Sequence, residues 1–280
     1  MRKSKVLAKL RSGQFARIAA TGHYLPFFVR YAAHFGYDGI WLDLEHRTMN
    51  DREAQAIIAA CHYNDIDCMV RPPTVGRTHL YHYLEDGAAG FMVPFVSTPA
   101  IAQQVVEAIK FPPLGNRGVD GAGLDGDYGM EAWKPNPTYF DDANRETFFV
   151  AQIETLEAVE NIEAIAAVPG VDCIFIGPGD LGLRLRVSDS PLTMPDVIAR
   201  VSAAAQRNGI AWGITAGSVE ALAHYRKLGA QIIPWGGDFA LMNVLKRCSE
   251  ELDGVLAGEL RSTGAGPRQE IAYGSADQAG

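Results

Sequence analysis

Acidic residues follow two neighbouring predicted strands of this sequence. Glu154 comes directly after the apolar run Phe148–Ile153, and Asp180 follows Cys173–Ile176 after a Gly-Pro-Gly turn. Two carboxylates that meet repel each other unless a cation lies between them, and oxygen ligands favour hard divalent ions. We therefore expect a site for Mg²⁺ or Mn²⁺, with Co²⁺ or Zn²⁺ as alternatives. In the competing interpretation, Glu154 caps the next helix and Asp180 closes the turn.

Basic side chains are expected at the same edge of the sheet. Arg71 ends another short apolar run, and its planar fork of donors suits a carboxylate or a developing oxyanion. An ion pair with a neighbouring acid is the alternative use of that fork. His46 lies just beyond Asp43 in the run Asp-Leu-Glu-His, where carboxylates favour the imidazolium and fix its tautomer. These surroundings predict a general acid or base.

Eight short apolar runs alternate with longer segments of helical spacing, which predicts parallel strands joined by crossover helices. The expected strands are Phe15–Ala20, Gly39–Asp43, Cys68–Arg71, Gly90–Pro94, Phe148–Ile153, Cys173–Ile176, Ala211–Ile214 and Gln231–Pro234. The expected helices are Pro26–His34, Asp51–Tyr63, Thr78–Glu85, Pro99–Ile109, Leu156–Ala167, Pro195–Asn208, Val219–Leu228 and Phe239–Leu252. In a chain of 280 residues this pattern favours an α/β fold of the (β/α)8 TIM-barrel type over an open doubly wound sheet. Catalytic groups of that barrel lie at the carboxyl ends of the strands.

We expect one barrel domain over residues 1–256, with an elaborated loop at 111–147. The length of its Gly-rich part suggests a mobile loop. Its place after the fourth helix puts it near the amino-terminal end of the barrel, unless it folds up the side or reaches a neighbouring subunit. Residues 257–280 form a polar tail that is predicted to be disordered or to dock on another chain. Met1–Gln14 lacks the apolar centre of a secretion signal, so a short helix is expected there.

Composition excludes several classes of protein. The net charge is −8 and the basic residues are dispersed, which argues against a nucleic-acid surface. No apolar run approaches the roughly 20 residues that cross a membrane. The four cysteines have no metal-type spacing, so we expect reduced thiols in a cytoplasmic protein. Motifs for dinucleotides, nucleoside triphosphates and serine nucleophiles are missing, and no lysine ends a predicted strand to form a Schiff base. A small-molecule substrate is the expected partner.

Several short motifs carry a family resemblance. They are Gly36-Tyr37-Asp38, Asp43-Leu44-Glu45-His46, Val70-Arg71-Pro72, Asp86-Gly87-Ala88, Val93-Pro94, Phe111-Pro112-Pro113-Leu114-Gly115-Asn116-Arg117-Gly118, Gln152-Ile153-Glu154 and Phe175-Ile176-Gly177-Pro178-Gly179-Asp180-Leu181. In this order they resemble the HpcH/HpaI aldolase family, the metal-dependent class II aldolases that use pyruvate. The resemblance covers about Phe35 to Leu181 and is weaker onward to the last helix.

The resemblance implies a role for each matched residue and a barrel of the phosphoenolpyruvate/pyruvate type. The residues so implied are Glu154 and Asp180 as metal ligands, Arg71 for the enolate, His46 paired with Asp86 for proton transfer, Asp43 and Gln152 as supporting or water-holding residues, and the backbone of Gly177, Pro178 and Gly179 as the cradle for the pyruvate carboxylate. A turn residue before Gly87 is the alternative for Asp86. The family also implies a homo-oligomer, a hexamer in which paired barrels exchange their final helices.

The activity implied is a carbon–carbon lyase that cleaves or forms 4-hydroxy-2-oxo acids through a pyruvate enolate, with a 2-oxo acid and an aldehyde as its partners. Leu44, the turn Trp235-Gly236-Gly237-Asp238 and the elaborated loop resemble the macrophomate synthase branch. An oxaloacetate decarboxylase or an enolate-trapping synthase is therefore the first alternative. A catalytically silent binding barrel and a phosphate-handling barrel that uses the Gly236-Gly237 turn are the others.

Overall fold

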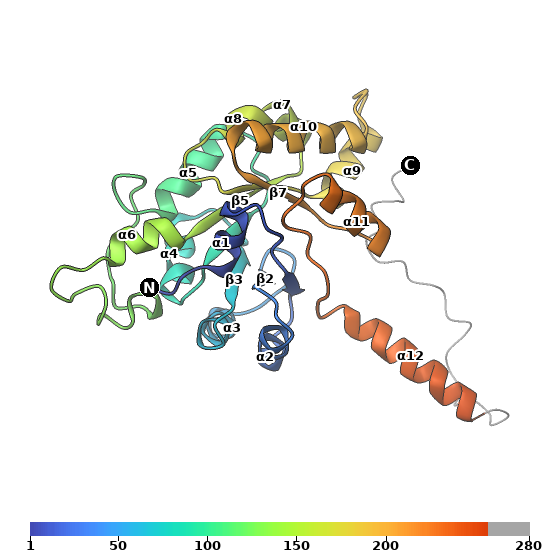
Figure 1. The fold of residues 1–280 in the computed structure, drawn as a ribbon, viewed down its shortest axis with the longest axis horizontal. Helices are drawn as coiled ribbons and strands as arrows, with labels where there is room; N and C mark the ends of the chain where they lie inside the picture. The colour runs from blue at the N-terminus through green and yellow to red at the C-terminus, as the bar shows by residue number, and fades with distance from the viewer. Residues whose placement is uncertain (257–280) are drawn as a thin grey trace.

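A computed structural model describes residues 1–256 of the chain (Figure 1). Its centre is one curled sheet of seven parallel strands in the order β1-β2-β3-β4-β5-β6-β7. The strands are β1 (Ile18–Thr21), β2 (Gly39–Asp43), β3 (Asp67–Arg71), β4 (Gly90–Val93), β5 (Phe148–Ile153), β6 (Cys173–Ile176) and β7 (Ala211–Ile214). Because each strand pairs with the next one in the chain, all carboxyl ends lie at one edge of the sheet.

The eighth predicted strand, Gln231–Pro234, is not a strand of the sheet. Its Ile232 forms isolated bridges with Ala16, just before β1, and with Gly213 of β7. The segment therefore bonds to both edges of the sheet without an extended ladder. Pro234 has no N–H to donate, and Gly236 has a φ of +87°, which bends the chain soon afterwards. The sheet is thus a curled seven-stranded one, and the prediction of eight strands in a closed barrel is wrong as stated.

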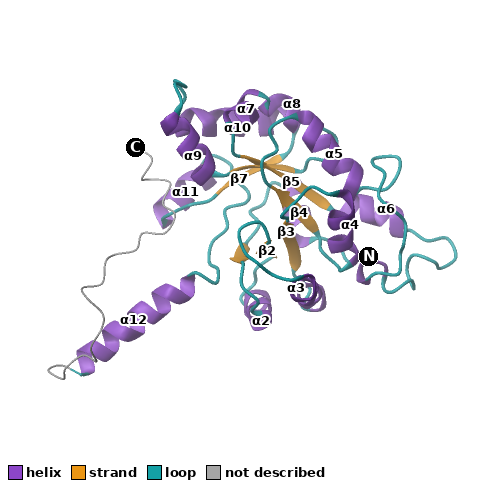
Figure 2. Ribbon diagram, turned by 180° about the vertical axis from the view of Figure 1, so that it is seen from behind, coloured by secondary structure: helices purple, strands orange, loops and turns teal. Residues whose placement is uncertain are grey.

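The helices of the described chain lie mostly on the outer face of the sheet (Figures 1 and 2). They are α1 (Lys5–Arg11), α2 (Pro26–His34), α3 (Asp51–Tyr63), α4 (Arg77–Glu85), α5 (Pro99–Ile109), α6 (Tyr139–Glu146), α7 (Leu156–Glu160), α8 (Ile162–Ala166), α9 (Pro178–Val187), α10 (Met194–Asn208), α11 (Val219–Lys227) and α12 (Ala240–Val255), with a 3₁₀ turn η1 at Leu124–Gly126. The predicted helix Leu156–Ala167 is two short helices that meet at Asn161. Helices α6 and α9 were not predicted.

Side chains of the strands alternate between two apolar cores, as the two-residue period of a strand requires. Trp41, Met69 and Phe175 point into the concave interior of the sheet, whereas Ile40 and Leu42 pack against the outer helices. Helix α1 also contributes its buried face to the interior cluster. It therefore fills the amino-terminal end of the interior and leaves the carboxyl edge for polar side chains.

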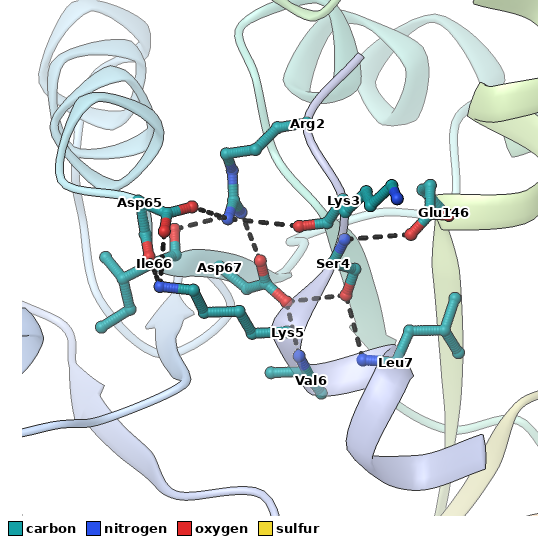
Figure 3. A network of polar contacts seen from close by, with 10 residues as sticks. All are labelled: Arg2, Lys3, Ser4, Lys5, Val6, Leu7, Asp65, Ile66, Asp67 and Glu146. Carbon is teal, nitrogen blue, oxygen red and sulfur yellow. Dashed lines mark hydrogen bonds and ion pairs between the residues drawn. The ribbon is translucent and has the colours of Figure 1, made fainter. Parts of the chain in front are cut away.

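A buried ion pair holds the N-terminus in this position (Figure 3). Asp67, the first residue of β3, has a fully buried side chain and binds the guanidinium of Arg2. It also accepts hydrogen bonds from the Ser4 hydroxyl at 2.7 Å and the Val6 N–H at 2.8 Å. Burial raises the pKa of Asp67, against the opposing effect of Arg2 and these donors. The short helix predicted near the N-terminus is therefore present, and its buried face fills the amino-terminal end of the sheet interior.

Residues 111–147 form a packed excursion near that end of the sheet. A small apolar cluster of Phe111, Ala132, Tyr139 and Ala143 packs with Met1. The excursion also contains a buried ion pair between Arg117 and Asp125, in which Nη2 and Oδ2 are 2.7 Å apart. The Tyr139 hydroxyl donates to the same oxygen at 2.7 Å. The excursion is therefore packed on itself and on Met1, whereas the mobility that its length suggests stays a prediction.

Helix α12 extends away from the rest of the described chain (Figures 1 and 2). None of its residues is buried, although it carries apolar side chains such as Leu245 and Leu252. Within residues 1–256, no helix is both long and apolar enough to span a membrane. The predicted tail at 257–280 lies outside the described residues.

Candidate active site

The polar residues singled out from the sequence gather at the carboxyl edge of the sheet, with one exception. Asp43 and Arg71 are the last residues of β2 and β3, and they stand opposite each other in the strand register. Glu154 comes directly after β5, and Asp180 lies in the first turn of α9, after β6. Four adjacent or nearly adjacent strands thus deliver three acids and an arginine to one edge.

Arg71 is held by two acids. Its Nε donates to Asp43 Oδ1 at 3.0 Å, and its Nη2 donates to Asp43 Oδ2 at 2.7 Å. Glu45 Oε2 lies 3.2 Å from the same Nε, and the guanidinium stacks on the Trp41 ring at 4.9 Å. Burial alone would raise the pKa of Asp43, but the bonds from Arg71 keep it below its ordinary value. Among the described residues Arg71 Nη1 has no partner, so the side chain is fixed while donors remain for a ligand.

Glu154 is a buried carboxylate whose surroundings oppose its ionisation. Its side chain accepts the Gln152 amide at 2.6 Å and the Phe95 N–H at 3.1 Å. Burial raises the pKa of Glu154 to about 7, and the charges of Glu45 and Asp180 contribute to that rise. Phe95 itself adopts a φ of +53°, a left-handed conformation uncommon for a large side chain. Such strain occurs most often at functional sites.

Asp180 is partly exposed and pairs within its own helix. Its Oδ1 lies 2.7 Å from Nη1 of Arg184, one turn further along α9. The guanidinium of Arg184 in turn lies 5.4 Å from the centre of the Phe95 ring. The two acids that the sequence predicts as metal ligands thus act on each other electrostatically, because Asp180 raises the pKa of Glu154.

The donor set at this edge fits a hard divalent ion. Glu45 and Asp180 raise the proton affinity of Glu154, and Asp180 also raises that of Glu45, as carboxylates do when no cation neutralises them. Gln152 is buried, and its Oε1 has no hydrogen-bond partner. A Cβ on Gly177 would overlap the Glu154 side chain, so the glycine leaves room for this carboxylate. Within residues 1–256, there is no group of three or more His, Cys, Asp or Glu that could hold a metal ion by itself. Mg²⁺ commonly takes only one or two carboxylates and completes its shell with water and substrate.

His46 and Asp86 do not meet within one chain. His46 follows β2 at the carboxyl edge, where its exposed ring lies 3.6 Å from Glu45. Asp86 ends helix α4, ahead of the start of β4, and therefore lies toward the opposite end of the sheet. It accepts the Gln55 amide at 2.6 Å, and burial raises its pKa. The structure shows no contact between the two residues in this chain.

Glu45 was overlooked as a site residue. It belongs to the Asp-Leu-Glu-His run, but only the structure shows that it contacts both Arg71 and His46. Alternation along a strand would have given a signal, because Asp43 and Glu45 are two residues apart and share one face. Helix α9 was also overlooked, so the first turn beginning at Pro178 was interpreted only as a loop.

A parallel sheet with acids and an arginine at its carboxyl edge defines a class of protein. It is an α/β enzyme whose site lies at the carboxyl ends of the strands. The HpcH/HpaI aldolase/citrate lyase family matches residues 24–243. Hydroxypyruvate/pyruvate aldolase of Deinococcus radiodurans is 36% identical over 224 residues, or 78% of each chain.

Two solved structures agree with that match. The HpcH/HpaI aldolase of Desulfitobacterium hafniense has a TM-score of 0.78 and 31% identity, over 90% of this chain and 97% of its own. Macrophomate synthase has a TM-score of 0.72 and 25% identity, over 91% of each chain. The protein belongs to the HpcH/HpaI aldolase/citrate lyase family, as the motifs in its sequence predict.

Proposed function

We propose that this protein is a divalent-metal-dependent, class II aldolase that cleaves or forms 4-hydroxy-2-oxo acids through a pyruvate enolate. The observation that carries the proposal is the buried Glu154, whose pKa is raised to about 7 beside Glu45 and Asp180. A carboxylate cluster of this kind is stabilised by a cation. The aldolase relatives supply the reaction class, and the fixed Arg71 fork supplies a site for a developing oxyanion.

Glu154 and Asp180 would hold the ion, with Gln152 beside them. The bound ion would act as a Lewis acid on the 2-oxo group of the substrate, and Mg²⁺ or Mn²⁺ fits these oxygen donors best. The carboxylate of the oxo acid would lie over the first turn of α9, where Pro178 begins the helix after Gly177. The N–H groups of a first helical turn have no partner inside the helix, which suits an anion.

Arg71 would hold the substrate oxygen that gains negative charge. Asp43 and Glu45 fix the guanidinium, so it need not reorganise as charge develops. His46 is assigned a proton transfer, either at C3 of the oxo acid or at its 4-hydroxyl group. A pair between His46 and Asp86 could form only across two copies of the chain, because they lie toward opposite ends of the sheet.

We also propose an assembly of several copies of the chain. The Gln231–Pro234 segment bonds to both edges of the sheet by isolated bridges, so the curled sheet is similar to a TIM barrel without an eighth strand. Helix α12 would pack on another copy, because it exposes Leu245 and Leu252 and buries no residue of its own. A homo-oligomer follows, a hexamer by family resemblance, and light scattering during gel filtration tests it.

A single assay series tests the reaction. Pyruvate formation would be measured from several 4-hydroxy-2-oxo acids and from oxaloacetate, with added Mg²⁺ or Mn²⁺ and with a chelator. We expect ion-dependent cleavage of the hydroxy-oxo acids, abolished in Glu154→Ala and in Asp180→Ala. Full activity of Glu154→Ala in the presence of chelator would refute the scheme.

Oxaloacetate decarboxylation or enolate trapping is the second candidate function, because macrophomate synthase has a similar fold and 25% identity. It uses the same enolate and the same residues, and it differs in the bond that breaks. Carbon dioxide release from oxaloacetate, with no aldehyde release from any hydroxy-oxo acid, would favour this candidate.

A further inference from the structure

A second histidine at the carboxyl edge is held by a buried aspartate. His23 follows the end of β1, and its Nδ1 lies 2.6 Å from Oδ2 of Asp238. The Asp238 side chain is only 3% exposed, whereas that of His23 is 57% exposed. One end of the imidazole is therefore fixed inside the protein, and the other end faces solvent.

The aspartate is itself fixed by the backbone. Its Oδ2 accepts the N–H groups of Gly22 at 2.9 Å and His23 at 3.1 Å, and it lies 3.3 Å from the Thr21 hydroxyl. Burial acts to raise the pKa of Asp238, but these donors and His23 lower it below the ordinary value. Asp238 is thus an ionised acceptor that joins the end of β1 to the segment that follows Gln231–Pro234.

This arrangement fixes the tautomer of His23. An ionised carboxylate can only accept, so Nδ1 carries the proton and the neutral ring presents a lone pair at Nε2. The described residues offer Nε2 no hydrogen-bond partner. A histidine oriented by an aspartate in this way is the arrangement used for general acid–base catalysis.

The pair lies beside the candidate site. A Cβ on Gly22 would overlap the side chain of Arg47, which comes directly after His46. The Arg47 guanidinium lies 5.0 Å from the centre of the Phe239 ring, and the His23 ring packs edge-on against Phe239 at 5.8 Å. The loops after β1 and β2 are therefore in contact. Asp238 is the charged group that contacts the His23 ring among the described residues, and Arg47 lies against the adjacent Gly22.

We propose that His23, oriented by Asp238, is the acid–base group for the acceptor oxygen of the aldol reaction. This inference rests on the proposed function and extends it to the aldehyde side of the site. His46 contacts Glu45, which also contacts Arg71, the residue assigned to the oxo acid, and so would serve C3. The substrate class is then a 4-hydroxy-2-oxo acid whose hydroxyl group faces the end of β1.

The proton transfer balances in both directions. In cleavage, Nε2 of His23 takes the 4-hydroxyl proton, and the O–H electron pair forms the carbonyl bond of the aldehyde. The C3–C4 bond breaks, and its electron pair stays on the enolate. The imidazolium releases its proton to water, and His46 delivers a proton to C3 to give pyruvate. In synthesis each movement is reversed.

Two measurements on the full chain with Mg²⁺ separate the steps. Exchange of pyruvate C3 protons in D₂O, followed by NMR, needs the enolate but no aldehyde. Cleavage of a 4-hydroxy-2-oxo acid needs both. We expect His23→Gln to lower kcat for cleavage about 100-fold, with KM and pyruvate exchange changed by less than about twofold. The limb of the kcat–pH profile that reports the base should also disappear.

Matched variants complete the test. His34→Gln changes an exposed histidine in the last turn of α2, away from the carboxyl edge, and should leave both rates unchanged. Asp238→Asn should lower cleavage at least 10-fold, because an amide no longer fixes the tautomer.

Three results would overturn the inference. The first is cleavage by His23→Gln at the rate of the unsubstituted protein. The second is a change in KM with no change in kcat, and the third is an equal loss of the exchange rate and the cleavage rate. If the unsubstituted chain shows neither ion-dependent exchange nor cleavage, the proposed function itself fails, and this inference fails with it.

Discussion

Replacing Glu154 by Gln should stabilise the metal-free protein in alkaline solution. The pKa of Glu154 is raised from 4.5 to about 7 in the folded protein, so its ionisation costs about 3 kcal/mol of unfolding free energy. The stability that the protein has while Glu154 is protonated is fully present below pH 4.5 and is lost as the pH rises through about 7. Glutamine is neutral throughout and can still accept the Phe95 N–H. A rotated Gln152 amide could bond to it through the oxygen that now lacks a partner.

Urea unfolding with a chelator at about pH 5 and about pH 8 measures this difference. We expect the variant to exceed the unsubstituted protein by up to about 3 kcal/mol at the higher pH and by much less at the lower one. Protein concentration must be equal in all samples, because assembly changes apparent stability. Added Mg²⁺ should then stabilise the unsubstituted protein but not Glu154→Gln. Parallel pH profiles of the two proteins would refute the electrostatic reasoning.

Three further changes give distinct results. Arg71→Lys should lower kcat at least 100-fold in the pyruvate assay while Mg²⁺ still raises Tm, because an ammonium group lacks the planar fork; unchanged turnover would exclude the oxyanion role. Gly177→Ala should weaken Mg²⁺ binding in calorimetric titration, because the new methyl group displaces Glu154; unaltered affinity would contradict the close packing. Arg2→Ala should cost about 3 kcal/mol in urea unfolding, because Asp67 is left buried without its cation; a loss below about 0.5 kcal/mol would show that its other donors suffice.

Much of the fold follows from local pattern. The strands Gly39–Asp43, Phe148–Ile153, Cys173–Ile176 and Ala211–Ile214 have the predicted bounds, because each is a short apolar run buried on both faces. The segment Gln231–Pro234 has similar composition but only isolated bridges. Whether such a run forms a ladder depends on the register of both neighbours, which its own residues do not specify.

The placement of candidate-site residues could be predicted only where they fall at strand ends. Asp43, Arg71 and Glu154 lie at one edge as predicted, since strand ends share one edge of a parallel sheet. The His23–Asp238 pair joins residues 215 positions apart, and no local pattern links them. The Asp86 assignment shows the reverse case, because similarity to a family motif does not place Asp86 near His46 in this chain.

Strand β3 has only five residues, yet its first and last residues have different roles. Asp67 binds Arg2 and so anchors the N-terminal segment, whereas Arg71 is held by Asp43 and is the residue proposed to bind the substrate oxygen. Substitutions at Asp67 would therefore change the fraction of molecules that are folded, and substitutions at Arg71 would change the activity of each folded molecule. Added stability at the Asp67 end could offset destabilising substitutions that alter specificity, without changing turnover.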